Sequence, residues 1–191
     1  MVTSDKNVNE NEEQDVTDLF PPPVFLPGED ETQFYDMREA LKLRFQPANA
    51  YQQWLVEETA RKMFENARHC QLRDSALVTA IRNEAAEVFE TGKLGTASGL
   101  GFDTAAEQFG KDLVSSDPDI RKTAIEKLIS LGITPGEVSA AAWMAIASEY
   151  EKHNHRSLEL ITCIRKLSDD LSRLQAAEAK AAEPAGVGVT S

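Results

Sequence analysis

Apolar residues recur every three or four positions along most of this chain, and no stretch alternates apolar and polar residues with a period of two. The first spacing gathers side chains on one face of a helix, whereas strict alternation is typical of a half-buried strand. β-Branched residues are scattered rather than clustered. The pattern therefore predicts an all-α protein.

Start and stop residues set the bounds of the expected helices. Asp30 can accept a hydrogen bond from an amide of the first turn, and Pro47 and Gly92 are typical terminators. Thr134, Pro135 and Glu137 form the clearest start signal in the chain. The two long expected helices span about 48–91 and 135–175. A first helix should begin at Asp30 and stop at Pro47. A short helix capped by Thr104 should carry Phe109 and Leu113, and another should begin with the Asp117 cap and end at Gly132. Because the two long helices match in length, we expect them to lie antiparallel, with the short-helix segment reversing the chain.

Both ends of the chain lack this periodicity. Residues 1–19 are rich in Asn, Asp and Glu and predict a disordered acidic tail. Residues 176–191 are mainly Ala, Gly, Val and Glu and predict a short disordered tail. Between them we expect a Pro-rich strap over 20–28 and a single helical domain over 29–175.

The strap holds three consecutive prolines with apolar neighbours, which force an extended backbone. Two interpretations are open. The strap packs on its own domain, or it docks into the aromatic groove of a partner protein. The residues that would make either contact are Phe20, Pro21, Pro22, Pro23, Phe25 and Leu26.

The last helix carries an unbroken heptad ladder, with alternating spacings of three and four residues. We call this ladder the seam. It comprises Trp143, Ile146, Tyr150, His153, Ser157, Leu160, Ile164, Leu167, Leu171 and Leu174. Leu158 and Ile161 lie beside the seam, so the apolar face is wider than a two-helix contact requires. The seam predicts either an intramolecular core or a homodimer formed through residues 143–174.

Composition narrows the class of protein. The 191 residues carry a net charge of −12, and 41% are hydrophobic, which is enough for a core. We expect no membrane span, because no apolar run reaches the roughly 20 residues that a bilayer requires. Cys70 and Cys163 cannot form a disulfide framework, and no signal-peptide pattern begins the chain, so we expect a cytoplasmic protein.

Histidines and carboxylates are densest between residues 149 and 159. Glu149 and His153 are four residues apart, as are Glu151 and His155, so each pair shares a helix face. These pairs do not converge on one face, and we expect a solvated surface rather than a metal site. We predict no catalytic residues, no cofactor and no metal, and therefore a non-enzymatic protein.

Residues 119–147 have the spacing of a helix-turn-helix, with Gly132 in the turn and apolar anchors at Leu128 and Val138. The second helix of such a motif reads base edges, usually with Arg, Lys, Asn or Gln. Here its first turns present Glu137 and Trp143, and no Lys or Arg occurs between Lys127 and Lys152. We therefore do not expect nucleic acid as a partner.

Three segments near the N-terminus carry a family resemblance. They are Leu-Pro-Gly-Glu-Asp at 26–30, Phe-Gln-Pro-Ala at 45–48 and Leu-Val-Glu-Glu at 55–58; the closing helix adds Tyr150-Glu151, Arg156 and the run from Leu167 to Gln175. About half of the chain thereby resembles a widespread group of uncharacterised bacterial proteins. The resemblance implies a helical bacterial protein and no particular activity. Some members of the group are associated with mobile elements.

These observations favour a non-enzymatic helical interaction or assembly protein whose protein partner is unknown. The alternative is an accessory DNA-binding protein of a mobile element or phage that uses the corner at 119–147.

Overall fold

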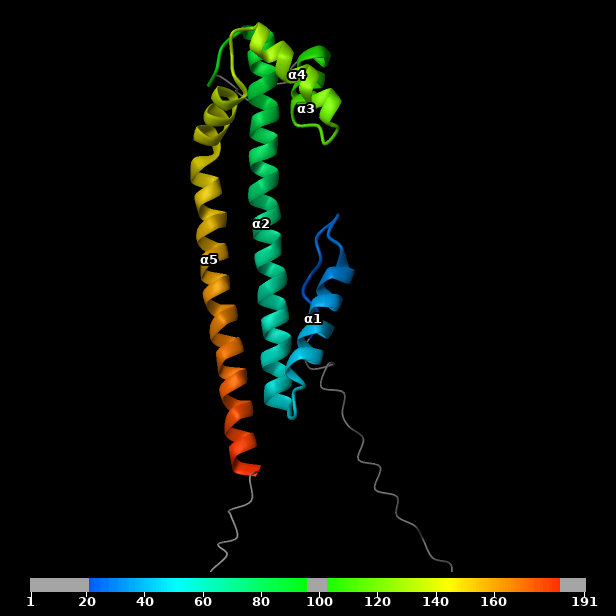
Figure 1. The fold of residues 1–191 in the computed structure, drawn as a ribbon, viewed down its shortest axis with the longest axis vertical. Helices are drawn as coiled ribbons and strands as arrows, with labels where there is room; N and C mark the ends of the chain where they lie inside the picture. The colour runs from blue at the N-terminus through cyan, green and yellow to red at the C-terminus, as the bar shows by residue number, and fades with distance from the viewer. Residues whose placement is uncertain (1–20, 96–102, 183–191) are drawn as a thin grey trace, which may run out of the picture. The chain divides into compact units, whose positions relative to one another are not determined.

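A computed structural model describes residues 21–95 and 103–182, and these residues form five helices and no strand (Figure 1). Their bounds are α1 Glu31–Phe45, α2 Ala50–Thr91, α3 Thr104–Leu113, α4 Pro118–Ser130 and α5 Pro135–Ala182. The prediction of an all-α fold with two long helices and a short-helix middle segment is confirmed.

Short polar side chains begin the helices. Asp30 caps α1 by accepting from the Thr32 amide, and Asp117 caps α4 by accepting from the amides of Asp119 and Ile120. At α5, Glu137 accepts from the Thr134 amide at 2.8 Å and donates its own amide to the Thr134 hydroxyl at 3.3 Å. This reciprocal capping box confirms the predicted start signal.

Three helix ends differ from the predicted bounds. The cap of α3 is Asp103 rather than Thr104, and α2 begins at Ala50 because the Asn49 side chain accepts from the Gln52 amide. The C-terminal tail expected over 176–191 was wrong for its first part, since α5 continues to Ala182. Alanine, which is abundant there, has the highest helix propensity, and Glu178 is held by the Asn49 and Gln52 side chains. The acidic tail at 1–19, Phe20 and residues 183–191 lie outside the described residues.

The chain divides into two compact units, to both of which α2 and α5 contribute. Unit 1 comprises residues 1–64 and 164–191, and unit 2 comprises residues 65–163. The domain expected over 29–175 thus covers parts of both units.

Unit 1 packs α1, the start of α2 and the end of α5 around two apolar clusters. In one cluster, Phe34 is 1% exposed and lies edge-on to Phe64, with ring centroids 5.7 Å apart. In the other, Leu171 of α5 packs on Leu55 and Val56 of α2. Burial of the large side chains on both sides of each contact supplies the main stabilising force of this unit.

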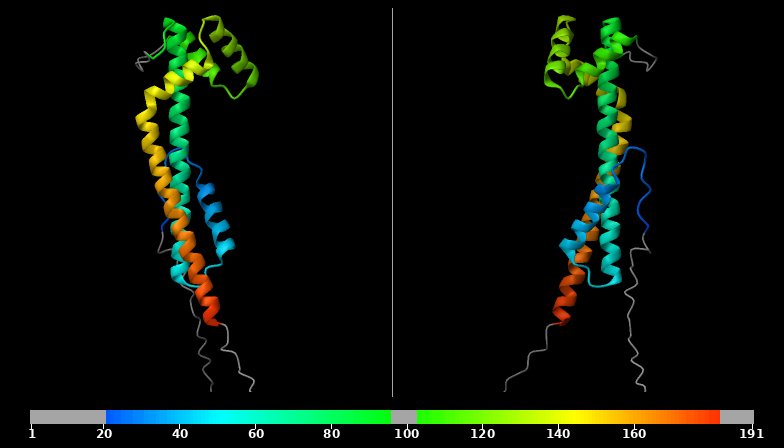
Figure 2. Two further views of the ribbon diagram at one scale, coloured as in Figure 1. Left: turned by 60° about the vertical axis from the view of Figure 1, so that its left-hand side comes forward. Right: turned by 90° about the vertical axis from the view of Figure 1, so that its right-hand side faces the viewer.

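Unit 2 packs the end of α2 and the start of α5 side by side, with α3 and α4 beside α2 (Figures 1 and 2). Glu65 of α2 contacts Arg156 of α5, and further along α2, His69 contacts His153, which comes earlier in α5. The two long helices are therefore antiparallel. At Gly110 of α3, an added Cβ would lie 2.3 Å from the Arg82 carbonyl oxygen. Glycine therefore permits the close crossing of α3 and α2.

Candidate functional site

The Pro-rich strap lies on its own unit. The Phe25 ring packs against Phe34 and Phe64, with centroids 6.0 and 5.6 Å away, and the Pro21 carbonyl accepts a hydrogen bond from Arg61. Val24 and Leu26, in contrast, are 82% and 46% exposed. The contacts of Phe25 favour an intramolecular strap over a docking motif, because the side chain that would anchor a partner is partly buried and packs against the unit's own core.

The seam residues are turned toward the chain's own helices, with one exception. Leu160 and Leu171 are 2% and 1% exposed, and Ser157 is buried. The other members from position 146 onward are half-buried: Ile146, Tyr150, His153, Ile164, Leu167 and Leu174. Trp143 departs from the predicted seam, since 42% of it is exposed and its ring rests on Tyr150 with centroids 4.2 Å apart. The chain's own helices therefore cover most of the seam, which favours the intramolecular core over the homodimer.

A polar layer crosses the helix pair of unit 2. The Ser157 hydroxyl is 2.6 Å from the Asn66 side-chain oxygen, and the Nδ1 atoms of His69 and His153 are 3.0 Å apart. One of these rings must carry its hydrogen on Nδ1 while the other accepts it. Arg156 closes the layer by donating to Glu65 at 2.7 Å.

Burial is the main cause of a lowered pKa at His69, and the neighbouring His153 adds to it. Arg156 and Arg68 lower this pKa further, whereas Glu65 raises it. If both His69 and His153 were protonated, their Nδ1–H groups would oppose each other and two positive charges would lie in a half-buried contact. This would weaken the contact. The layer is therefore a proton-sensitive structural contact between α2 and α5.

Metal-ligating residues do not gather within the described part of the chain: no group of three His, Cys, Asp or Glu side chains could hold an ion there. His153 faces His69, whereas His155 forms an ion pair with Glu159 at 3.3 Å on the surface. The two histidines of the predicted cluster are thus directed to different surroundings.

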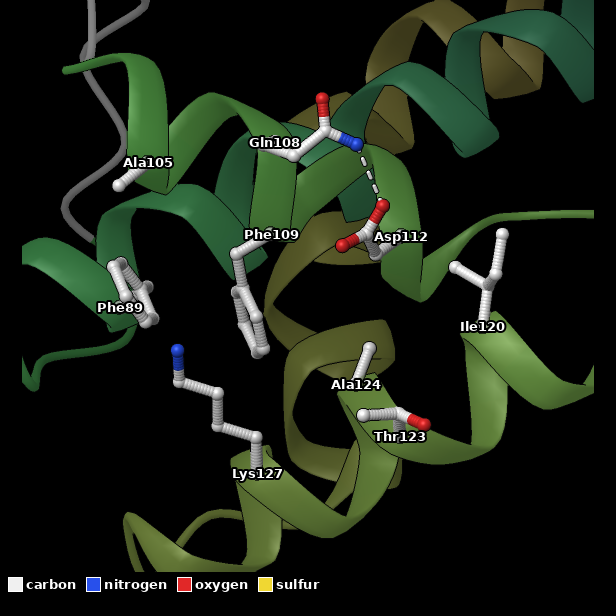
Figure 3. Close-up of a pocket in the computed structure, with 9 residues that line it drawn as sticks. All are labelled: Phe89, Ala105, Gln108, Phe109, Asp112, Ile120, Thr123, Ala124 and Lys127. Carbon is white, nitrogen blue, oxygen red and sulfur yellow. Dashed lines mark hydrogen bonds between the residues drawn. The ribbon is translucent and has the colours of Figure 1, made fainter.

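A cleft of about 490 Å³ lies in unit 2 between α2, α3 and α4 (Figure 3). Phe89 and Phe109 stack at its base, with centroids 4.9 Å apart, and the Lys127 ammonium lies 4.2 Å from the centre of the Phe89 ring. At the rim, Asp112 accepts a hydrogen bond from Gln108 at 2.7 Å. Lys127 therefore occupies the aromatic face that would attract a cationic ligand, and its contacts with Phe89 and Phe109 link α4 to α2 and α3.

The corner between α4 and α5 has the predicted turn. Gly132 is left-handed, with φ +83°, while Leu128 and Val138 are fully buried in the core of unit 2. The outer side of the first turns of α5 presents Glu137, whose pKa is lowered by hydrogen bonds from Thr134, so this group is ionised at neutral pH. A carboxylate at this position repels phosphate.

Exposed apolar side chains gather on α5 within unit 2, and sequence reasoning assigned them no role of their own. Met144 is 77% exposed, Leu158 56% and Ile161 48%. Leu158 and Ile161 were expected to widen the buried face, but they lie outside it. The signal that could have identified them is their own heptad spacing, which is offset from that of the seam.

No helix in the described residues is both long enough and apolar enough to cross a bilayer. In comparisons with known proteins, no family model, no curated protein and no solved structure matches this chain.

Proposed function

We propose that this protein is a non-enzymatic helical interaction or assembly protein, and that the exposed face of α5 in unit 2 is its docking surface. The observation that carries the proposal is the exposure of three large apolar side chains on one helix: Met144, Leu158 and Ile161. Full burial of each would contribute roughly 1.5–3 kcal/mol. Single exposed apolar residues are ordinary, whereas several on one helix face favour an interaction site. Leu158 and Ile161 are neighbours on the surface of α5, and Met144 lies on the same face two heptads earlier.

The position of this face supports the same reading. The α5 helix is held firmly from behind, since Tyr150, His153 and Ser157 are packed against α2. A partner that binds the outer face would therefore meet a helix that is already ordered, which reduces the entropic cost of association.

DNA binding through the α4–α5 corner is the alternative. It would need base-reading and phosphate-binding groups on the outer side of residues 135–147, where Glu137 is the charged residue. A gel-shift titration at about 150 mM salt separates the two functions, because non-specific binding is weak under that condition. We expect no shift of labelled DNA that persists when unlabelled competitor DNA is added. A sharp shift that persists would identify the α4–α5 corner as the functional site.

Photo-cross-linking tests the proposed docking surface. A photoreactive phenylalanine analogue replaces Leu158 in cells that express the protein, and the same analogue replaces Leu43, which is 76% exposed on α1, as the matched control. We expect a discrete protein adduct from position 158 and none from position 43. A second variant carries the analogue at Ile161, and absence of an adduct at both 158 and 161 would overturn the proposal.

A further inference from the structure

The exposed apolar residues of α5 belong to a second heptad ladder, which we call the outer stripe. It comprises Met144, Ala147, Glu151, Asn154, Leu158 and Ile161, with spacings of 3, 4, 3, 4 and 3 residues. All six positions lie in unit 2. Glu151 is exposed, and Ala147 and Asn154 are half-buried. The stripe is therefore a coiled-coil face along about 27 Å of helix, at 1.5 Å per residue.

The outer stripe is symmetric along the helix. Its midpoint lies between Lys152 and His153, and the positions on either side of that point are evenly matched. If a second α5 lies antiparallel across this point, Met144 faces Ile161 of the other copy. Ala147 then faces Leu158, which joins a small side chain to a large one, and Glu151 faces Asn154.

We propose that two copies of the chain associate through their outer stripes as a two-fold symmetric, antiparallel helix pair. The proposal rests on the proposed function and names the partner as a second copy. A two-fold interface requires a self-complementary surface, in which each contact occurs twice. The outer stripe is self-complementary in size and in polarity. The apolar residues of one copy face apolar residues of the other, and Glu151 faces Asn154 at the centre.

The central polar pair decides the direction of the two helices. In an antiparallel pair, the Asn154 amide can donate to the Glu151 carboxylate of the second copy. In a parallel pair, Glu151 would face Glu151 and two carboxylates would repel each other at the centre of the contact. A polar residue within a coiled-coil face is known to select one register and one partner arrangement at some cost in stability.

The positions that flank the outer stripe on its solvent side are compatible with self-association. They are Ser148, His155 and Thr162, and none is a Lys, Arg, Asp or Glu. Two copies can approach without like-charge repulsion along this edge.

Sedimentation equilibrium of the full chain tests the proposal. Because the contact is short, we measure at about 10–200 µM, a range suited to small interfaces. The wild-type chain of 21.1 kDa should sediment with twice that mass at the upper end of the range. Leu158→Glu should sediment as a monomer, because it places a charge against Ala147 of the other copy.

Leu43→Glu is the matched control, since it makes the same change at an exposed leucine of unit 1. Circular dichroism is used to check that both variants keep their helix content. If Leu158→Glu loses helix content, Ile161→Lys is the second test variant. A monomeric wild type, or a Leu158→Glu variant that still dimerises, would overturn the proposal. A monomer that nevertheless forms a photo-adduct with a different protein at position 158 would refute the homodimer and leave the proposed function standing.

Discussion

Unit 1 and unit 2 are built from the same two long helices but use their apolar residues differently. In unit 1, Phe34, Leu55 and Leu171 are each 1% exposed, and the partly buried Phe25 of the strap packs against the core. Its exposed large apolar residues, Val24, Leu26, Leu43 and Tyr51, are spread over the strap, α1 and α2. In unit 2, the contact between α2 and α5 contains a polar layer. Its exposed large apolar residues occur on α2, on and after α4 and, in the largest number, on α5: Leu72, Val78, Ile120, Ile129, Leu131, Trp143, Met144, Leu158 and Ile161.

The difference indicates which part of the molecule is complete by itself. Unit 1 also pairs buried polar groups within itself: Gln52 is fully buried and donates to Glu178 at 2.6 Å, and the buried Glu57 carboxylate forms an ion pair with Lys42 at 3.3 Å, although its Oε1 atom has no hydrogen-bond partner. Unit 2 covers its seam residues wholly or in part, apart from Trp143, and leaves Met144, Leu158 and Ile161 of the outer stripe exposed. We therefore propose that unit 1 contributes most of the folding stability and that unit 2 carries the docking surface.

The largest expected effect breaks the core of unit 1. Phe34→Ala removes the ring that joins Phe25, Tyr35 and Phe64. It should lower the free energy of unfolding by about 3–5 kcal/mol, as is usual for a buried phenylalanine. Met144→Ala on the outer stripe is the comparison and should cost less than about 0.5 kcal/mol in the monomer. Urea denaturation of both variants at low protein concentration measures the two values; equal losses would remove the distinction between the units.

The next effect concerns the close crossing within unit 2. Gly110→Ala places a Cβ against the Arg82 carbonyl, a backbone atom that cannot rotate away. We expect a loss of about 1–3 kcal/mol, the usual cost of overpacking, with amide exchange accelerating in α3 and α4. Gly136→Ala is the control, because its nearest contact would be an ordinary 3.9 Å to the Thr134 hydroxyl. Similar losses for the two variants would show that α3 does not depend on this approach.

A smaller effect concerns the cap of α4. Asp117→Ala removes the acceptor for the Asp119 and Ile120 amides, at 2.9 and 3.3 Å. The expected loss is about 1 kcal/mol, and Asp117→Asn should recover most of it because the amide oxygen can still accept. Thermal melts of the three proteins compare them. If Asn is as destabilising as Ala, the capping hydrogen bonds contribute little.

The smallest effect is a change in pH dependence. Because the folded chain holds the pKa of His69 below its ordinary value, the unfolded chain binds the proton more readily. Stability should therefore fall as pH drops through about 6.5, the ordinary histidine value. His69→Gln removes this contribution, so its stability should change less between pH 7 and 5 than that of the wild type. A variant as acid-sensitive as the wild type would exclude His69 as the source.

Much of the fold could be predicted from local signals. Asp30, Asp117 and Thr134 each mark a helix start that depends only on the next few residues, and the 3–4 spacing of the seam identifies the buried side of α5. Local signals did not predict the features that depend on contacts between residues distant in the sequence. The contact of Glu178 with Asn49 and Gln52 extends α5, and the contact of Phe25 with Phe64 fixes the strap.

The candidate site shows the same limit. The sequence contains the spacing of the outer stripe, but it cannot say which of two adjacent heptad ladders faces α2. That choice depends on the register of two helices about 80 residues apart, which places His69 opposite His153 and leaves Leu158 outside. Sequence reasoning therefore identified a contact face on α5 and assigned possible dimerisation to the ladder that the chain itself uses.

Disulfide cross-linking between two chains tests the central claim most directly. One chain carries Ala147→Cys and the other Leu158→Cys, both in a background in which Cys70 and Cys163 are replaced by serine and whose helix content and sedimentation match the wild type. In the antiparallel pair these two positions face each other, whereas each lies roughly 16 Å along the helix from its own twin, at 1.5 Å per residue. A disulfide needs Cα atoms within about 7 Å. After exchange and mild oxidation, the mixture should yield a linked dimer and each variant alone should remain monomeric on a non-reducing gel. Linkage within each single variant, or none in the mixture, would contradict the account.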